Sequence, residues 1–476
     1  MDRAGFVERP ALTVLQSERR IYRLTRRALP QAHSRSLDRF AVSAKCAAAP
    51  LPDNLRLAPD PQCAYFALES SSARARLLHG PIATRYALSP KAMLTLTGFS
   101  MRKPRYEISQ ARALEWLAEI HATAQATVES LSAADQGAFE ARLTKLIQRC
   151  ACGPDKIARR GHAIADLGSA DFGSMALYDV TRHPRGRGTA ARSKLFAEVV
   201  NAYFETEFAE ERVAPSEIIH VTCTGYVAPS GAQRLVASKG WGKHTQVTHA
   251  YHMGCYAAFP AIRLAAGQLG VQEALAPTSS VRRVDIVHTE LCTLHLDPSD
   301  HSAEQCVVQS LFGDGFIRYS LCDSSDHAGL TVLSLSENIL PDSAESMGWS
   351  VADFGMHMTL ARDVPDRIAT SLRAFVSELF RKANISLAEN LRTTVFAVHP
   401  GGPKIIDRVR DMLELSDEQL QTSRDVLLDH GNMSSATLPH VWMRILQQPA
   451  VPPGTLVLSL AFGPGLTVCG GLFRKL

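Results

Sequence analysis

The chain of 476 residues is long enough for two or three average domains or one large two-lobed core. Hydrophobic residues make up 46% of it and charged residues 21%, as in an ordinary soluble protein, and no uninterrupted apolar run of 18 residues predicts a membrane span. Residues 1–45 hold ten Lys or Arg and four Asp or Glu, whereas the remainder is nearly neutral. We therefore expect no nucleic-acid surface on the body of the chain.

Residues 1–90 are rich in Ala, Arg, Ser and Pro and show little periodicity. We predict a basic, poorly ordered extension that is not catalytic. The arginine-punctuated start does not resemble a secretory signal, and the ten scattered cysteines lack a disulfide-like spacing, so we expect reduced thiols and a cytoplasmic protein. Cys150 and Cys152 form a CxC pair, but no second pair or nearby histidine completes a zinc site, so we expect no metal.

Strand and helix patterns alternate from about residue 92 to the end of the chain. In the first half they predict a strand at 92–100, helices at 108–131 (begun by Ser109) and 194–208, and strands at 217–224, 284–291 and 311–321. In the second half they predict helices at 364–383, 404–413 and 434–446 and strands at 393–399, 454–463 and 466–473. This alternation predicts an α/β protein whose mixed or parallel sheets are covered on both faces.

A lone cysteine, Cys255, precedes a helix that is apolar nearly all round, from Ala257 to Leu269. Pro260 fits only in the first turn of that helix, so the helix begins near Cys255. A thiol at the positive end of a helix dipole is expected to have a lowered pKa. The alternative for a single cysteine is a packed core residue.

Two further polar residues stand where secondary structure changes. His399 ends a predicted strand, and the Pro-Gly-Gly-Pro that follows prevents the strand from continuing. Asn432 precedes a helix start capped by Ser434 or Ser435. Cysteine, histidine and asparagine together can supply a nucleophile for thioesters and two donors for a developing oxyanion.

Five stretches of this chain resemble the chalcone synthase family, the type III polyketide synthases of the thiolase superfamily. They are "HMGCYAAFPAIRLA" around Cys255, "LDPSDHSAEQCVVQSLFGDG" (296–315), "VHPGGPKIID" around His399, "LLDHGNMSSAT" around Asn432 and "AFGPGLTVCGGLF" (461–473). The motifs occur in the family's order, and the similarity covers about residues 91–476. The resemblance implies a five-layered αβαβα fold of two pseudo-repeated halves, 91–325 and 326–476, and a homodimer.

The resemblance also implies that Cys255 carries the acyl chain while His399 and Asn432 promote decarboxylation and condensation. It implies no cofactor, since the acyl donors are thioesters of coenzyme A (acyl-CoA and malonyl-CoA) or of an acyl carrier protein. The function expected is therefore acyl transfer followed by decarboxylative Claisen condensation, with an alkylpyrone or alkylresorcinol type of product. The alternatives are a single-condensation ketosynthase that takes carrier-protein substrates and, more remotely, a non-catalytic partner subunit of a condensing enzyme.

Several positions depart from the family pattern or are expected to bind substrate. Leu296 and Met358 replace phenylalanines that are usual in plant members, which we interpret as room for a longer aliphatic starter. Thr224 is expected to line the cavity and Gly465 to shape its floor. Lys156, Arg159 and Arg160 are expected at the tunnel mouth, where cations meet phosphates. Residues 121–150 are interpreted as an inserted helical hairpin.

Overall fold

The computed structural model describes residues 93–275, 282–323 and 328–476. The extension predicted for residues 1–90 therefore lies outside the described residues. Within those residues, no helix is both long and apolar enough to cross a lipid bilayer.

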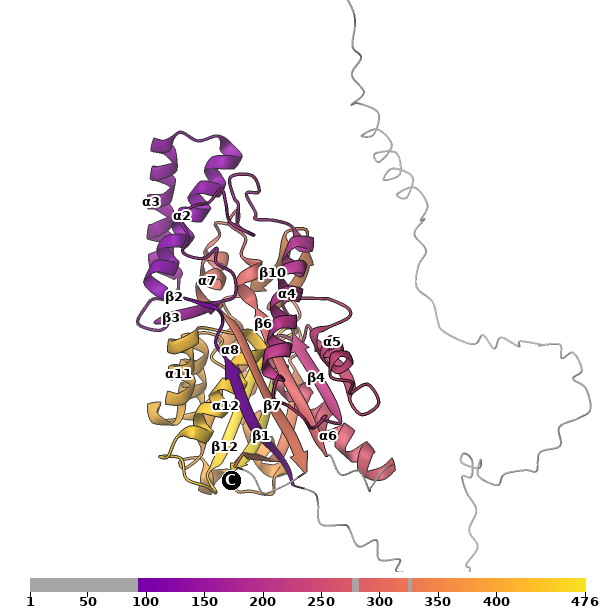
Figure 1. The fold of residues 1–476 in the computed structure, drawn as a ribbon. Coiled ribbons are helices and arrows are strands. Elements are labelled where there is room, and N and C mark those ends of the chain that lie inside the picture. The colour runs from indigo at the N-terminus through magenta and orange to yellow at the C-terminus, as the bar shows by residue number, and fades with distance from the viewer. Residues whose placement is uncertain (1–92, 276–281, 324–327) are drawn as a thin grey trace, which may run out of the picture. The chain divides into compact units, whose positions relative to one another are not determined.

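Nine strands form one large mixed sheet in the order β11-β12-β13-β8-β1-β7-β6-β4-β5 (Figure 1). Strand β4 runs parallel to β5 and β6, and β11 runs parallel to β12, whereas the remaining neighbours are antiparallel. The strands are β1 (Leu94–Arg102), β4 (Glu217–Thr222), β5 (Gln246–Tyr251), β6 (Arg283–Leu291), β7 (Asp314–Asp323), β8 (Leu330–Ile339), β11 (Val395–Val398), β12 (Leu456–Gly463) and β13 (Thr467–Lys475).

The large sheet consists of two groups of strands that meet at β1 and β8. The first group is β5-β4-β6-β7-β1 and the second is β8-β13-β12-β11. Only two residue pairs, Thr95 with Thr331 and Leu96 with Leu330, join β1 to β8, whereas β1 pairs with β7 along most of its length. A short join therefore connects the two strand groups.

Helices and two small hairpins complete the described structure. The helices are α2 (Gln110–Glu129), α3 (Ala133–Cys150), α4 (Thr189–Glu207), α5 (Gly231–Ser238), α6 (Ala258–Leu275), α7 (Ala303–Leu311), α8 (Val364–Lys382), α9 (Leu387–Asn390), α10 (Pro403–Leu413), α11 (Asp417–His430) and α12 (Thr437–Gln447). Short 3-10 helices are η1 (Gly254–Tyr256), η2 (Cys292–His295) and η3 (Ser434–Ala436). The small hairpins are β2 (Tyr106–Ser109) with β3 (Arg159–His162), and β9 (Met347–Ala352) with β10 (Gly355–Leu360).

The helices and strands form five layers, which pack together through three apolar cores. The middle core holds α6 and α12 between the two groups of strands, with α6 contacting β4, β6, β7 and β13. A second core packs α2, α4 and α5 against the outer face of the first strand group, and a third packs α8 and α10 against the outer face of the second. The order helix, sheet, helix, sheet, helix is the expected αβαβα arrangement.

Burial alternates along the strands, which explains how each sheet contributes to two cores. In β6, Val284 and Ile286 face the middle core, whereas Val287 and Leu291 face the outer one. In β12, Val457 and Ala461 face the middle core. Because successive side chains of a strand point to opposite faces, a strand with helices on both sides has to be apolar throughout.

Most elements predicted from the sequence are present, with small shifts at their ends. Ser109 caps α2 as expected, since its side chain accepts a hydrogen bond from the backbone N–H of Arg112. Periodicity missed the strands β2, β3, β5, β8, β9 and β10 and the helices α5, α7, α9 and α11. These segments are either polar on one face or too short to show a clear period.

Candidate active site

Cys255 lies in the 3-10 helix η1, directly ahead of the central helix α6. Gly254 precedes it with φ +73°, and a Cβ added there would lie 2.7 Å from Cδ of Pro464, so this turn requires glycine. Pro260 lies in the first turn of α6, as predicted. The backbone before α6 thus places Cys255 at the start of a helix that lies between the two strand groups.

The Cys255 thiol is buried and lies among hydroxyl and amide groups of the second half of the chain. Its Sγ is 3.9 Å from Oγ of Ser434. Burial raises the pKa of Cys255 to about 12. The sequence-based expectation of a lowered pKa is therefore wrong for the unliganded site, because desolvation outweighs the stabilisation of a thiolate by the helix start.

Asn432 follows α11 and enters the short helix η3. Its side-chain oxygen accepts the backbone N–H of Ser434 at 2.9 Å, which is the capping role expected for an asparagine at a helix start. Its side-chain Nδ2 donates to the carbonyl oxygen of Gly401 at 3.3 Å. This second contact connects Asn432 to the turn that follows His399.

His399 lies immediately after β11 and is 1% exposed. Its backbone N–H donates to the carbonyl of Leu460 at 2.8 Å, which extends the pairing of β11 with β12 by one residue. Neither ring nitrogen has a hydrogen-bond partner among the described residues. Burial lowers the pKa of His399 to about 3, so the ring is neutral at neutral pH.

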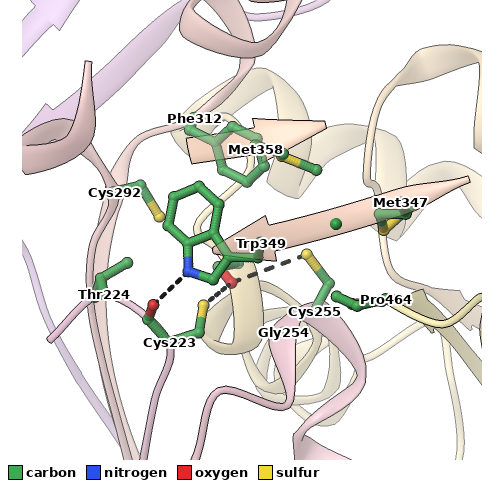
Figure 2. A pocket seen from close by; sticks show the side chains of 12 residues that line it. Cys223, Thr224, Gly254, Cys255, Cys292, Phe312, Met347, Trp349, Met358 and Pro464 are labelled. Carbon is green, nitrogen blue, oxygen red and sulfur yellow. Dashed lines mark hydrogen bonds between the residues drawn. The ribbon is translucent and has the colours of Figure 1, made fainter. Parts of the chain in front are cut away.

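A pocket opens beside Cys255 at the junction of the two halves (Figure 2). Thr224 and Met358, which were predicted to bind substrate, both line it. The other lining residues are Cys223, Gly254, Cys255, Cys292, Phe312, Met347, Gly348, Trp349, Ser434 and Pro464.

Two predicted pocket residues lie outside this lining. Leu296 is buried, and its backbone N–H donates to the hydroxyl of Tyr178 at 3.0 Å. Gly465 adopts φ +103°, and its carbonyl oxygen accepts from the hydroxyl of Ser343. The neighbouring Pro464 lines the pocket in its place.

The three predicted phosphate-binding cations have different surroundings. Lys156 and Arg159 are exposed and form surface ion pairs with Asp155 and Glu107, at 3.4 and 3.5 Å. Arg160 is 3% exposed, so its prediction as a tunnel-mouth cation is wrong.

The Arg160 guanidinium is held entirely by the interior of the protein. Its Nε donates to the side-chain oxygen of Gln110 at 2.8 Å, and its Nη1 donates to the carbonyls of Gln309 and Phe312 at 2.8 and 2.7 Å. These contacts connect α2, β3 and the end of α7. Arg160 therefore stabilises the fold and cannot face an incoming phosphate.

The sequence analysis missed Glu290, a fully buried carboxylate at the end of β6. It accepts hydrogen bonds from the backbone N–H of Cys223 at 3.1 Å, from the Thr224 hydroxyl at 2.9 Å and from the Ser435 hydroxyl. Burial raises its pKa. β6 also contains Arg283, Asp285, His288 and Thr289, so no sequence signal singled out Glu290.

The Glu290 contacts continue into the middle core through a histidine and a tyrosine. Ser435 is 3.0 Å from Nδ1 of His288, and Nε2 of His288 is 3.1 Å from the hydroxyl of Tyr319. If Glu290 is ionised, Ser435 donates to it, His288 donates to Ser435 and Tyr319 donates to His288. Every polar atom along this path thus has a partner.

Within residues 93–275, 282–323 and 328–476, no three His, Cys, Asp or Glu side chains gather closely enough to hold a metal ion. Cys255 supplies a thiol to the pocket, whereas the neutral imidazole of His399 and the amide of Asn432 are not among the residues that line it. A thiol can attack an activated carbonyl, and the other two groups can donate hydrogen bonds to a developing oxyanion.

Comparison with known proteins identifies similar chains. Residues 331–476 match the family model of chalcone and stilbene synthases, C-terminal domain. The probable polyketide synthase 1 of Dictyostelium discoideum is 31% identical over 265 residues, which are 55% of this chain and 8% of that protein. A putative chalcone synthase of Bacillus subtilis is 29% identical over 274 residues, which are 56% of this chain and 71% of that protein.

Solved structures share the fold along almost their full length. The C-terminal type III polyketide synthase domain of the Dictyostelium hybrid Steely1 superposes with a TM-score of 0.66 at 23% identity, covering 80% of this chain and 99% of that one. PKS-I of the brown alga Ectocarpus siliculosus gives a TM-score of 0.66 at 21% identity, covering 81% of this chain and 98% of that one.

The structure contains the helical hairpin expected at 121–150, formed by α2 and α3, although its first helix begins earlier, at Gln110. That this hairpin is an insertion relative to the family stays a prediction.

Proposed function

We propose that this chain, which belongs to the type III polyketide synthase family, transfers an acyl group to Cys255 and extends it by decarboxylative Claisen condensation with a malonyl thioester. We assign the nucleophile to Cys255 and the oxyanion donors to His399 and Asn432. The halves 91–325 and 326–476 would then each contribute part of the site, since Cys255 belongs to the first and the two donors to the second.

Acyl loading begins when a thioester enters the pocket beside Cys255. Sγ bonds to the acyl carbon, the thiol proton passes to the His399 ring, and the carbon–sulfur bond to the leaving thiol breaks. The leaving thiolate then takes that proton. Because burial disfavours both a lone thiolate and a lone imidazolium here, we place this proton transfer in the step in which the substrate arrives.

Condensation follows when a malonyl thioester takes the place of the departed thiol. Loss of CO₂ leaves an enolate, whose oxygen accepts hydrogen bonds from the His399 ring and from Nδ2 of Asn432. The enolate carbon attacks the acyl group on Cys255 and displaces Sγ, which is reprotonated. The product is a β-keto thioester two carbons longer, and exclusion of water protects both reactive species.

The observation that carries this proposal is the unpartnered His399 ring. Among the described residues, both of its nitrogens lack a hydrogen bond, although the residue is 1% exposed. A buried polar group without a partner costs about 1–3 kcal/mol, so a fold that retains one has a use for it. A substrate carbonyl or enolate oxygen would supply the missing partner.

We further propose that the enzyme is a homodimer and that its acyl donors are coenzyme A thioesters. Strand β5 is the edge of the first strand group, with one pairing partner, and the nearby side chain of Tyr226 is 45% exposed. An unpaired edge beside an exposed aromatic ring is suited to a second copy of the chain. The eight cysteines of the described residues are free thiols, which fits the cytoplasmic location that we expected.

The test is intact-protein mass spectrometry of wild type and Cys255→Ala, each incubated with a series of acyl-CoAs from two to sixteen carbons. We expect a mass increase equal to the acyl group in wild type only, followed by extended products when malonyl-CoA is added. Labelling by acyl carrier proteins but by none of the acyl-CoAs would reject the coenzyme A donor and favour a ketosynthase that uses carriers. A chain that no acyl thioester labels would contradict the proposed activity.

A further inference from the structure

The chain that leaves α3 is held against α7 by hydrogen bonds. The backbone N–H of Cys152, two residues past the end of α3, donates to Oγ of Ser310 at 3.0 Å, across 158 positions of the chain. Nε2 of Gln110 donates to the carbonyl of Cys152 at 2.7 Å and to the carbonyl of Ser310 at 2.8 Å. The face of α7 that carries Ser310 is therefore fixed against the end of α3.

Two cysteines, Cys150 and Cys306, lie together at this contact. Cys150 is the last residue of α3, and Cys306 precedes Ser310 by four positions, so Cys306 lies on the same face of α7. Both cysteines pack in the apolar core that holds α2 and α4. Each thiol shifts the pKa of the other, which requires the two to be close neighbours. The fold thus brings together two thiols from distant parts of the sequence.

The two thiols differ in exposure and in charge environment. Cys150 is partly exposed, whereas Cys306 is 4% exposed. Burial raises the pKa of Cys150, but the Cys306 thiol and the Arg149 guanidinium oppose this rise. Burial raises the pKa of Cys306 to about 12, and the Cys150 thiol adds to the rise. Because the thiolate is the reactive form and has to be reached from solvent, an oxidant meets Cys150 first.

Other cysteines of the described residues lack this combination. Cys322 is the second partly exposed one, and burial and the Asp285 carboxylate raise its pKa to about 11. None of the described cysteines is among the groups that shift it. Cys255 is buried, and burial raises its pKa to about 12. A reachable thiol beside a cation and a second thiol is therefore found at Cys150.

We propose that Cys150 and Cys306 are a redox-sensitive pair that hydrogen peroxide oxidises reversibly to a disulfide between α3 and α7. This inference does not depend on the proposed acyl transfer. The Cys150 sulfur attacks one peroxide oxygen and becomes a sulfenic acid, while the other oxygen leaves as water with the thiol proton. The Cys306 sulfur then attacks the Cys150 sulfur and displaces its hydroxyl group, which leaves as a second water with the Cys306 proton. Two thiols lose two electrons, and one hydrogen peroxide is reduced to two waters.

The disulfide reinforces a contact that hydrogen bonds already make. It closes a loop of residues 150–306, and a cross-link of this kind stabilises a protein mainly by restricting its unfolded chain. In a reducing compartment such disulfides are transient and serve as redox sensors, so the pair agrees with the reduced thiols expected from the sequence. The oxidised enzyme is therefore a more stable form in which α3 is clamped to α7.

The test is disulfide mapping of the full chain by mass spectrometry. Wild type, Cys150→Ser, Cys306→Ser and the matched control Cys152→Ser are treated with hydrogen peroxide, their free thiols are alkylated, and the chains are digested with trypsin without reduction. We expect wild type and Cys152→Ser to give a cross-linked pair of the tryptic peptides 150–156 and 284–318, which dithiothreitol separates. Cys150→Ser and Cys306→Ser should both lose this pair.

Urea unfolding gives a second readout of the same samples. Oxidation should shift the unfolding midpoint of wild type and Cys152→Ser to a higher urea concentration and leave that of Cys150→Ser unchanged. Cys255 should still be recovered as an alkylated thiol at the lowest peroxide concentration that completes the cross-link.

Two results would overturn the inference. One is a peroxide-treated wild type in which Cys150 and Cys306 are both still alkylated after Cys255 has been oxidised. The other is a disulfide that joins either of them to a different cysteine. Both results can be read from wild type alone, so they decide the question even if a serine variant does not fold.

Discussion

Two buried polar side chains, Glu290 and His399, have opposite surroundings. Glu290, at the end of β6, accepts hydrogen bonds from a backbone N–H and two hydroxyls and is connected through Ser435 to His288. His399, at the end of β11, has no partner for either ring nitrogen among the described residues. Both are at most 1% exposed, so burial alone does not distinguish them.

The difference indicates that Glu290 stabilises the fold, and it fits the substrate-binding role that we propose for His399. A satisfied buried group fixes its neighbours, and removing it leaves several donors without an acceptor. An unsatisfied one contributes little to stability, and its replacement removes a cost. The predictions below test this comparison, from the largest expected effect to the smallest.

Replacing His399 with leucine should separate activity from stability. We expect condensation to fall by about 10²- to 10⁴-fold, because a proton carrier and oxyanion donor is lost. The free energy of unfolding should stay the same or rise, since two unpaired nitrogens leave the interior. Product formation and denaturant unfolding measure the two effects, and a clear loss of stability would contradict the unsatisfied state of His399.

Arg160, like Glu290, is a buried charged group with hydrogen-bond partners in the interior. Arg160→Met should lower the free energy of unfolding by about 3–5 kcal/mol, because a side-chain amide and two carbonyls then lose their donor in the interior. Urea unfolding measures the change. If the variant is as stable as wild type but binds acyl-CoA weakly, then Arg160 belongs at the tunnel mouth after all.

Glu290→Gln keeps the shape of the side chain and turns one acceptor into a donor. The amide cannot accept from all three donors, so we expect a loss of about 1–3 kcal/mol in unfolding free energy. Denaturant midpoints of this variant and His399→Leu, measured together, give the comparison directly. If both variants lost the same unfolding free energy, Glu290 and His399 would not differ in their contribution to stability.

Low pH should change the free energy of unfolding in opposite directions through the buried histidines and through Glu290. Burial lowers the pKa of six histidines to about 3 or 4, namely His121, His220, His288, His295, His399 and His440. Below pH 6.5 the unfolded chain binds protons that these folded rings exclude, so stability falls as pH falls, by up to about 1.4 kcal/mol per pH unit for each ring. The raised pKa of Glu290 works the other way, favouring the folded state at low pH.

Unfolding midpoints between pH 7 and 5 test this dependence. His399→Leu removes one histidine that takes up a proton on unfolding. The slope of unfolding free energy against pH should therefore become smaller and keep its sign. A slope that is flat in wild type would show that these rings are protonated in the folded state.

The smallest effect is expected at the surface. Arg159→Ala removes an ion pair with Glu107 in which both side chains are about half exposed, and we expect unfolding free energy to change by less than about 1 kcal/mol. The KM for acyl-CoA decides whether Arg159 also meets phosphate. An unchanged KM would leave Arg159 without a role in substrate binding.

Sequence patterns were most informative where proline or glycine restricts the backbone. Proline and glycine placed His399 at a strand end and Cys255 at a helix start, and both lie there in the structure. The catalytic roles of Cys255, His399 and Asn432 stay predictions until they are measured.

What the sequence could not provide are the contacts between distant segments. The partners of Arg160 are 50 to 152 positions away, so a basic run looked like a surface. Trp349 lies in a hairpin too short to show a period, and it meets Cys223 across 126 positions. The pKa of Cys255 depends on its whole enclosure rather than on the helix that follows it.

The short join between β1 and β8 has a consequence for how the protein is made. β1 is the first described strand, yet its partners β7 and β8 begin more than 200 positions later. At a synthesis rate of about 5–20 residues per second, β1 leaves the ribosome roughly 10–50 seconds before either partner exists. During that time an apolar strand stays unpaired, so we expect slow, chaperone-sensitive folding in which β1 is inserted last.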